Sequence, residues 1–337
     1  MQSWSLYPAK NGLGEYQQAW DRLNAFLFAG HPYFDSKFIA PLLKYFSNDQ
    51  VQLCVHRSAE TIDGMLLIEP KGPAKWSVFT PAQAQITPLF LTQPQDLRTL
   101  LPKLPGLLLG LDFPCQDPCY SPLDNTLPDW QSAPVQHALT INIRLDNGSF
   151  DDYLASRTTR FRNNLSRRFK KVREAGYDLC LKQIEDPEQM HSAITRFGDM
   201  ESKGWKQTQG TAVHVENEQG HFYQAMMENF AGSGQACVYE LMFGGESVAM
   251  ELCILSAEML ILLKTAHDPN HACYSPGRLL LYLLLQQEFA LKRVKTVEFY
   301  TNADVNELAW AEGQRWIKHH MLLRNKLLRY GYQVFKG

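Results

Sequence analysis

The residues best suited to chemistry lie where a strand-like segment meets an apolar helix. The segment 274–278 reads Tyr-Ser-Pro-Gly-Arg and precedes an unbroken apolar run, 279–285. The first amides of a helix have no partner within it, and the helix dipole adds partial positive charge there. Such an end favours phosphate groups. We therefore predict a phosphate-binding loop with Ser275, Gly277 and Arg278 as its cofactor-binding residues, although the same residue types also begin helices that bind nothing.

Two charged residues stand in strand-like segments just before this loop. Glu251 interrupts the apolar run 248–255, and Lys264 lies at the end of the run 259–265. A carboxylate among apolar neighbours is expected to have a raised pKa, which suits a general base. Lys264 is expected to pair with Glu251 or with a cofactor phosphate. The alternative for Glu251 is a solvent-facing position on its strand.

Three further polar residues follow the strands on either side of the loop. His267 can exchange a proton near neutral pH, but a histidine at a strand end is often only a polar loop residue. Tyr300 is a candidate general acid, and Asn302 could hydrogen-bond a bound ligand. The competing interpretation makes Asn302 or Asp304 the N-cap of a following helix.

A strongly basic segment lies upstream of these residues. Residues 157–173 hold eight basic side chains and no acid. Such a run is often only a solvated helix face; otherwise it attracts acidic partners. We predict a partner-binding surface at Arg167, Arg168 and Lys171 for an acidic acyl carrier protein, donor phosphates or an anionic glycan. The segment is short and has no interleaved aromatics beyond Phe161 and Phe169, so it does not predict sequence-specific nucleic-acid binding.

The pattern of apolar residues predicts the elements that position these side chains. In the first half we expect helices over 16–29 and 36–46, strands over 51–57 and 64–69, and irregular structure through the proline-rich stretch 102–134. A strand is expected over 138–145. In the second half we expect one helix over 150–175, with Phe161, Leu165, Phe169 and Val172 on its apolar stripe.

The remaining elements alternate in a way typical of a mixed α/β domain. Helices are expected over 186–203, 222–231 and 279–291. Three strands joined by tight turns are expected over 236–243, 247–255 and 259–265, followed by a strand over 294–300 after the last helix. The order is therefore helices, an antiparallel meander, the phosphate loop, a helix and a strand.

The composition restricts the class of protein. The chain has 337 residues, 45% hydrophobic, with a formal net charge of −2. This size indicates two domains or one large one, and the charge argues against a general nucleic-acid binder. Cys115 and Cys119 are the only close pair of the seven cysteines, so we predict no metal site and reduced thiols in a cytoplasmic protein. No apolar run approaches the ~20 residues that span a bilayer.

The order and spacing of these features resemble the GNAT acyltransferase superfamily, and more narrowly its branch of FemAB aminoacyl ligases and CelD-type proteins. The matching segments are His31–Phe34, the arginine-rich helix ending at Gly176, the block 201–206 with Trp205, the hairpin 244–249, and the loop 274–280. The loop is a shortened form of the six-residue loop of ordinary GNAT enzymes, because only Ser275, Gly277 and Arg278 remain.

The resemblance implies a mixed-sheet α/β fold with two tandem GNAT-like domains. A degenerate N-terminal domain is expected over 1–138 and an acyltransferase domain over 139–337. The implied donor is acyl-CoA or a phosphopantetheine-linked acyl group, held where the strands 259–265 and 294–300 separate. We therefore expect an N-acyltransferase acting on a small-molecule or glycan-linked amine. The alternatives are a FemAB-like ligase that uses aminoacyl-tRNA on a cell-wall precursor, and a catalytically silent scaffold in a polysaccharide or lipid pathway.

Overall fold

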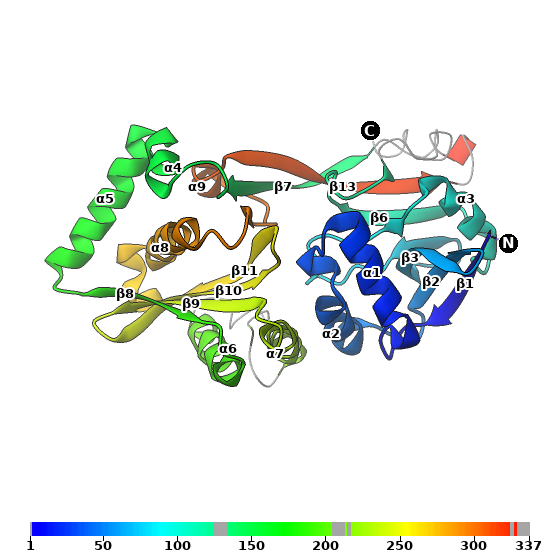
Figure 1. Ribbon diagram of the computed structural model, residues 1–337, viewed down its shortest axis with the longest axis horizontal. Helices are drawn as coiled ribbons and strands as arrows, with labels where there is room; N and C mark the ends of the chain where they lie inside the picture. The colour runs from blue at the N-terminus through cyan, green and yellow to red at the C-terminus, as the bar shows by residue number, and fades with distance from the viewer. Residues whose placement is uncertain (1, 124–133, 204–212, 214–216, 324–326, 329–337) are drawn as a thin grey trace. The chain divides into compact units, whose positions relative to one another are not determined.

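The chain folds into two compact units. The computed structural model describes residues 2–123, 134–203, 213, 217–323 and 327–328. One unit comprises Met1–Thr140 with Arg315–Gly337, and the other comprises Ile141–Gln314 (Figure 1). Strands β7 (Val135–Arg144) and β13 (Gly313–Leu323) each contain residues of both units. The expected mixed α/β class is confirmed. In the sequence block 201–206, Trp205 lies outside the described residues.

The first unit is a mixed sheet covered by helices on both faces. Alternate residues of its strands face α3 on one side, where Cys54 and Leu66 join Leu97 and Leu100 in a buried cluster. On the other side α1 and α2 cover the sheet (Figure 1). The elements are β1 (Gln2–Pro8), α1 (Gln17–Phe28), α2 (Ser36–Phe46), β2 (Gln52–Ser58), β3 (Thr61–Pro70), β4 (Lys75–Val78), β5 (Phe90–Leu91), α3 (Leu97–Leu100) and β6 (Gly110–Gln116). β13 continues this sheet beside β6.

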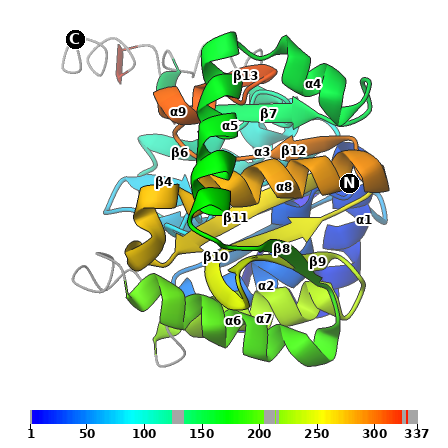
Figure 2. The same cartoon turned by 90° about the vertical axis from the view of Figure 1, so that its left-hand side faces the viewer.

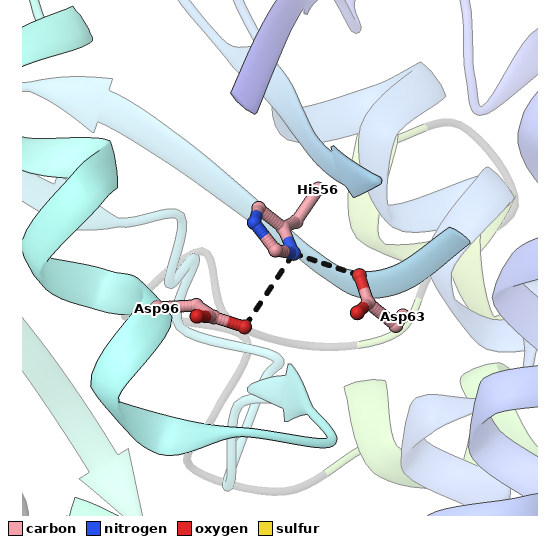
Figure 3. Close-up of side chains that lie close together, drawn as sticks. All are labelled: His56, Asp63 and Asp96. Atoms are coloured by element: carbon pink, nitrogen blue, oxygen red, sulfur yellow. Dashed lines mark hydrogen bonds and ion pairs between the residues drawn. The ribbon is translucent and has the colours of Figure 1, made fainter. Parts of the chain in front are cut away.

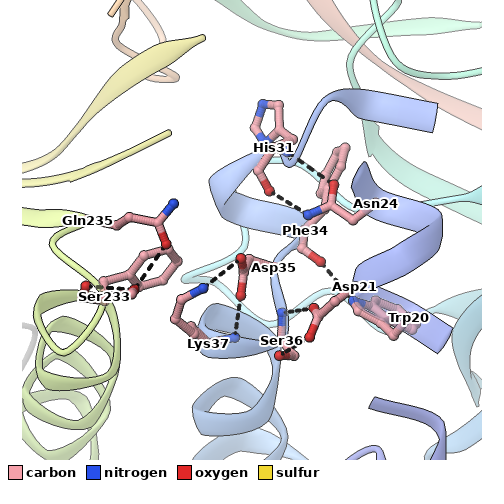
Figure 4. A network of polar contacts seen from close by, with 11 residues as sticks. Trp20, Asp21, Asn24, His31, Phe34, Asp35, Ser36, Lys37, Ser233 and Gln235 are labelled. Atoms are coloured by element: carbon pink, nitrogen blue, oxygen red, sulfur yellow. Dashed lines mark hydrogen bonds and ion pairs between the residues drawn. The ribbon is translucent and has the colours of Figure 1, made fainter. Parts of the chain in front are cut away.

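Buried hydrogen bonds fix the turn between α1 and α2 (Figure 4). The Trp20 indole Nε1 donates to the Phe34 carbonyl oxygen at 2.7 Å. The Asn24 side chain and the backbone of His31 exchange two hydrogen bonds of 3.1 Å each. Burial, together with the positive charge of Arg315, lowers the pKa of His31 to about 3. His31, which belongs to the segment that carried the family resemblance, is therefore a neutral structural residue.

The second unit is built on a six-stranded part of the sheet, in the order β7-β12-β11-β10-β9-β8. From β8 to β11, each strand is antiparallel to its neighbour, whereas β12 runs parallel to β11 and antiparallel to β7. The strands are β8 (Leu179–Ile184), β9 (Ala236–Phe243), β10 (Glu246–Leu255), β11 (Met259–His267) and β12 (Thr296–Glu298). The expected meander and the strand after the last helix are confirmed.

Helices cover both faces of this sheet. α6 (Pro187–Ser202) and α7 (Glu218–Ala231) lie on one face, and α8 (Pro276–Leu291) lies on the other with α4 and α5 (Figure 1). Figure 2 shows α5 running across α8. The single helix expected over 150–175 is wrong, because it is two helices, α4 (Phe150–Ser156) and α5 (Thr159–Glu174). Thr158, in an extended conformation, caps the second by accepting from the amide of Phe161.

Two further sequence expectations are corrected. The stretch 102–134 is not wholly irregular, because β6 lies within it and contains Pro114. β8 and β13 were not predicted. β8 alternates half-buried and exposed residues, so its apolar signal is weak. β13 has the sequence Gly-Gln-Arg-Trp-Ile-Lys-His-His-Met-Leu-Leu. Its apolar and polar residues do not alternate regularly, so the sequence does not show the usual pattern of a strand.

A buried charged network anchors the end of α8 that lies away from the loop. Glu288 is fully buried and accepts hydrogen bonds from Arg293, the shortest of 2.6 Å, and from the Tyr239 hydroxyl on β9. Burial opposes the charge of Arg293, but its hydrogen bonds to Glu288 and the negative charge of that residue raise the pKa of Arg293. The network ties α8 to the sheet and so sets where its first turn lies.

Replacing Arg293 with methionine should destabilise the protein by about 3–5 kcal/mol, because the mutation leaves Glu288 as an unpaired buried charge. The Lys292→Met variant, which changes an exposed neighbour, should stay within about 0.5 kcal/mol of the parent. Denaturant unfolding measures both. Equal stability of the two variants would show that the pair does not anchor the helix.

Candidate active site

A cleft opens in the second unit where β11 and β12 stop pairing. The two strands pair only from Met259 with Thr296 to Ile261 with Glu298. Beyond that point β11 continues to His267 and pairs with β10 alone among the described residues. Its register with β10 skips Leu263, a bulge that changes the direction of the strand. One edge of β11 therefore presents backbone amide and carbonyl groups to the cleft.

A cavity of about 400 Å³ fills this cleft. Its wall comes from β11, the start of α8, the segment after β12, and α9 (Val305–Leu308). The wall has an apolar and a polar part. The apolar part includes Leu262, Leu281, Phe299 and Trp310, and the polar part includes Glu251, Lys264, Thr265 and His267. This volume suits a small-molecule site with a few placed polar groups.

Glu251 is the buried carboxylate of the cavity. It is 5% exposed and accepts a hydrogen bond from the hydroxyl of Thr265, its partner across the β10–β11 ladder. The register places both side chains on the face that α8 covers, where the Thr265 methyl group also lies near Gly277. The solvent-facing alternative for Glu251 is thus not what the structure shows. A buried carboxylate in a cavity can accept a proton from a bound ligand.

Lys264 is held by a carboxylate from the other face of the sheet. Its Nζ lies 3.2 Å from Glu201 of α6 and 5.4 Å from the centre of the Tyr223 ring. Glu201 also accepts a 2.6 Å hydrogen bond from the amide of Val213. Burial and the negative charge of Glu201 raise the pKa of Tyr223. Lys264 also lines the cavity, and it forms an ion pair with Glu201 of α6.

The predicted phosphate loop forms the start of α8 and part of the cavity wall. Ser275 adopts a left-handed conformation with φ 57° and does not cap the helix with its side chain. The strained backbone is uncommon for a serine. A Cβ atom built on Gly277 would lie 3.7 Å from Thr265, so the glycine is not required by packing. Ser275, Gly277 and Arg278 all line the cavity.

Arg168 of α5 joins this loop from another part of the chain. Its guanidinium donates to the hydroxyl of Ser275. Partial burial and the positive charges of Arg278 and Arg167 lower the pKa of Arg168. Two arginines thus converge at the start of α8, where the helix dipole adds further positive potential. This arrangement favours a bound phosphate group.

The other predicted site residues lie around the cavity. His267 is exposed and lines it. Tyr300 is buried, with φ 48°, between the lining residues Phe299 and Thr301, but does not itself line the cavity. Asn302 is exposed and lies outside the wall.

The residues predicted to bind a partner divide into two groups on α5. Arg168 contacts Ser275, and Lys171 donates to the carbonyl oxygen of Cys273 at 3.1 Å. Both therefore reach the loop. Arg167 faces outward and lines an open hollow on the same helix with Arg160, Asn163 and Ser166.

Several lining residues escaped the sequence reasoning. Thr265 was hidden because its pairing with Glu251 depends on strand register. Asn306 and Glu307 belong to α9, where Asp304 is the N-cap through hydrogen bonds to both their amides. The capping interpretation is therefore the one the structure shows for Asp304. Trp310 is both core and wall, because the Phe161 ring packs edge-on against it at 4.7 Å.

A second polar cluster lies in the first unit (Figure 3). The Nδ1 atom of His56 lies 2.7 Å from Asp63 and 3.6 Å from Asp96. Such atoms also occur together in metal sites. Here the hydrogen bond to Asp63 accounts for the ring orientation, while Nε2 points into buried surroundings without a hydrogen-bond partner in the described chain. We assign the cluster a structural role.

Comparisons with known proteins agree with the geometry of the second unit. Residues 159–307 match the family model described as "Acetyltransferase (GNAT) domain". The fold is similar to the crystal structure of FemX, with 10% identity, coverage of 95% of this chain and 98% of that one, and a TM-score of 0.59. It is also similar to L-PGS from Bacillus licheniformis, with 12% identity, coverage of 89% and 90%, and a TM-score of 0.51.

A third similar structure is a conserved protein of unknown function from Bacteroides thetaiotaomicron, with 12% identity, coverage of 91% and 97%, and a TM-score of 0.57. No curated protein sequence matches the chain significantly. The resemblance to the GNAT superfamily is supported by the family match over residues 159–307, and the similarity to FemX and L-PGS shows a shared fold. In the described residues, no helix is long and apolar enough to cross a membrane.

The loop geometry predicts that Arg168→Ala weakens binding of inorganic pyrophosphate about ten- to hundredfold, since a charge-assisted hydrogen bond contributes about 1.5–3 kcal/mol. Arg173→Ala is the matched control, because Arg173 is an exposed arginine of the same helix. Isothermal titration calorimetry measures both affinities. If Arg168→Ala binds pyrophosphate as tightly as the control, the anion does not bind at this loop.

Proposed function

We propose that the protein is an N-acyltransferase that moves an acyl group from a thioester donor to an amine by direct attack. The match of residues 159–307 to the acetyltransferase (GNAT) family model supports this proposal. The observation that carries the proposal is the placement of a buried carboxylate, Glu251, in the same cavity as the arginine-bearing start of α8. One part of the cavity can hold a phosphorylated donor, and the other can remove a proton.

The donor is proposed to be acyl-CoA or an acyl group on phosphopantetheine. Its phosphate lies against Ser275, Gly277, Arg168 and Arg278, where amides and guanidinium groups converge. Its amide-containing arm runs along the open edge of β11, whose backbone groups face the cleft and can form hydrogen bonds of the kind that a neighbouring strand would make. This route leads the thioester to Glu251, and the apolar wall around Phe299 and Leu262 covers the acyl group.

Transfer then needs two proton movements. The amine nitrogen attacks the carbonyl carbon and forms the new C–N bond, while Glu251 accepts the proton that the nitrogen loses. Amides of the open β11 edge can donate to the carbonyl oxygen as negative charge develops on it. The C–S bond breaks, and the sulfur leaves with the electron pair and takes up one proton. Positioning of the two reactants in one cavity adds to the acceleration.

The leaving sulfur has two candidate proton donors. His267 lies in the cavity wall, and Tyr300 is a buried residue between the lining residues Phe299 and Thr301. A thiol has a pKa of about 8.5, so its thiolate is a good leaving group even without a strong acid. We keep Tyr300 as the proposed acid because it directly follows the lining residue Phe299.

Two other functions are compatible with this fold. A FemAB-like ligase would use aminoacyl-tRNA as its donor, and a silent scaffold would bind without turnover. The buried carboxylate in an open cavity favours an enzyme over a scaffold, because an unused buried charge costs stability. The amine acceptor is proposed to be a small molecule or a glycan-linked amine.

Glu251→Gln should lower kcat for thiol release about 10²–10⁴-fold, because the amide keeps the shape but cannot accept the proton. Glu246→Gln, an exposed residue of the same strand, should behave as the parent. The assay follows thiol release from acyl-CoA over a panel of primary amines. Near-parental turnover of Glu251→Gln across neutral pH would show that Glu251 is not the general base, and His267 would be the next candidate.

Tyr300→Phe tests the proposed acid by removing only the hydroxyl. It should lower kcat about tenfold or more for a poor thiol leaving group and have less effect on an activated aryl thioester, which needs no proton. The comparison of the two donors separates catalysis from a general loss of structure. An equal effect on both donors would give Tyr300 a structural role.

A further inference from the structure

We propose that the exposed basic face of α5 docks an acidic carrier protein, which delivers the acyl thioester to the cleft on a phosphopantetheine arm. This inference rests on the proposed function and specifies its donor. It also divides the basic residues of α5 into those that receive the arm and those that receive the protein.

The docking face is defined by the charged residues of α5 that point to solvent. The apolar stripe of the helix packs inward, with Leu165 and Val172 buried and Phe169 edge-on against Tyr282 at 4.9 Å. The docking face consists of the exposed residues Arg160, Arg162, Arg167, Lys170 and Arg173, whereas Lys171 reaches the loop. The helix of 16 residues presents them over a length of roughly 24 Å.

This face is positive because almost nothing neutralises it. The only acid of α5 is Glu174, whose carboxylate lies 3.6 Å from Lys170. Among the described residues, the other exposed cations of α5 have no carboxylate within ion-pair distance. The whole chain has a formal net charge of −2, so its charge is strongly polarised. Such a face speeds the encounter with acidic partners, and salt weakens the effect.

The same helix reaches the cleft. Arg168 contacts Ser275, Lys171 donates to Cys273, and the Phe161 ring packs against the cavity residue Trp310. A partner seated on the outer face is therefore within about one helix diameter of the phosphate loop, since the inner and outer sides of one helix are about 10–12 Å apart. A phosphopantetheine arm carries one phosphodiester group. This one group matches the one place, at the start of α8, where Arg168 and Arg278 come together.

The outer face also carries a hollow suited to carboxylates. Arg160, Asn163, Ser166 and Arg167 line it, and all four offer hydrogen-bond donors. A guanidinium group binds a carboxylate through two parallel hydrogen bonds. An acidic helix of a partner would place carboxylates at matching one-turn intervals along α5.

The chemistry favours an acidic protein over a nucleic acid. Binding to RNA draws on many phosphate contacts and on aromatic side chains that stack with bases. The two aromatic residues of α5, Phe161 and Phe169, pack inward instead. Free CoA would use the loop but not the outer face. A carrier protein is the donor that uses both.

The experiment compares three donors with the same acyl group: an acidic phosphopantetheine carrier protein, CoA, and pantetheine, which has no phosphate. Thiol release is measured at low and at high salt, where screening lengths differ several-fold. The test variant is Arg160→Glu/Arg167→Glu. The matched control is Arg98→Glu/Lys103→Glu, two exposed residues of the first unit whose replacement changes the net charge equally.

For the parent, kcat/KM for the carrier donor should exceed that for pantetheine at least about tenfold at low salt and fall with salt. In the variant, the ratio of kcat/KM for the carrier donor to kcat/KM for pantetheine should fall about tenfold. In the control, this ratio should keep its parental value. A variant that uses the carrier as well as the control does would overturn the docking proposal alone. Binding of a transfer RNA to the outer face, without binding of the carrier protein there, would also overturn the docking proposal.

Failure of the proposed function gives a different result. In that case the parent releases thiol from none of the three donors. Docking is then tested by calorimetric titration of the parent and the variant with the carrier protein. Tight, salt-sensitive binding lost in the variant supports the face as a carrier site, and absence of binding to the parent rejects it.

Discussion

The second unit depends on the early loss of pairing between β11 and β12. Three residue pairs join the strands, and beyond them, within the part of the chain that the structure describes, β11 pairs with β10 alone. A strand edge inside a protein normally leaves polar backbone groups unsatisfied, which is costly unless something pairs with them. The opened edge therefore explains why a cavity lies there and why its wall is both polar and apolar.

Helices on the two sides of the opening set its chemistry. α8 begins beside β11, so its positive end and Arg278 meet the cavity, and the network of Glu288 and Arg293 fixes the other end of that helix. α5 crosses α8 and brings Arg168 to the same point (Figure 2). The positive charges converge on the loop, while Glu251 lies one strand away beneath α8. The proposed phosphate site and the proposed proton acceptor are thereby separated within one cavity.

Much of this arrangement could be predicted from local sequence. α2 and β9 have the expected bounds, 36–46 and 236–243, because periodicity and flanking turn residues define them. The break between α4 and α5 was missed, since only the extended conformation of Thr158 marks it. β6 was missed because prolines dominate its surroundings. β13 was missed because its residues reveal no simple alternation.

The candidate site shows the same limit. The loop residues and Glu251 could be proposed from the sequence, because the loop directly precedes one apolar run and Glu251 interrupts another. Thr265, Glu201 and the contact between Arg168 and Ser275 depend on strand register or on helix crossing, which no local pattern encodes. Hydrogen–deuterium exchange with a non-hydrolysable thioether analogue of acyl-CoA tests the central claim most directly. The account predicts new protection of the amides in 262–267 and at the start of α8; binding without protection of these amides would contradict it.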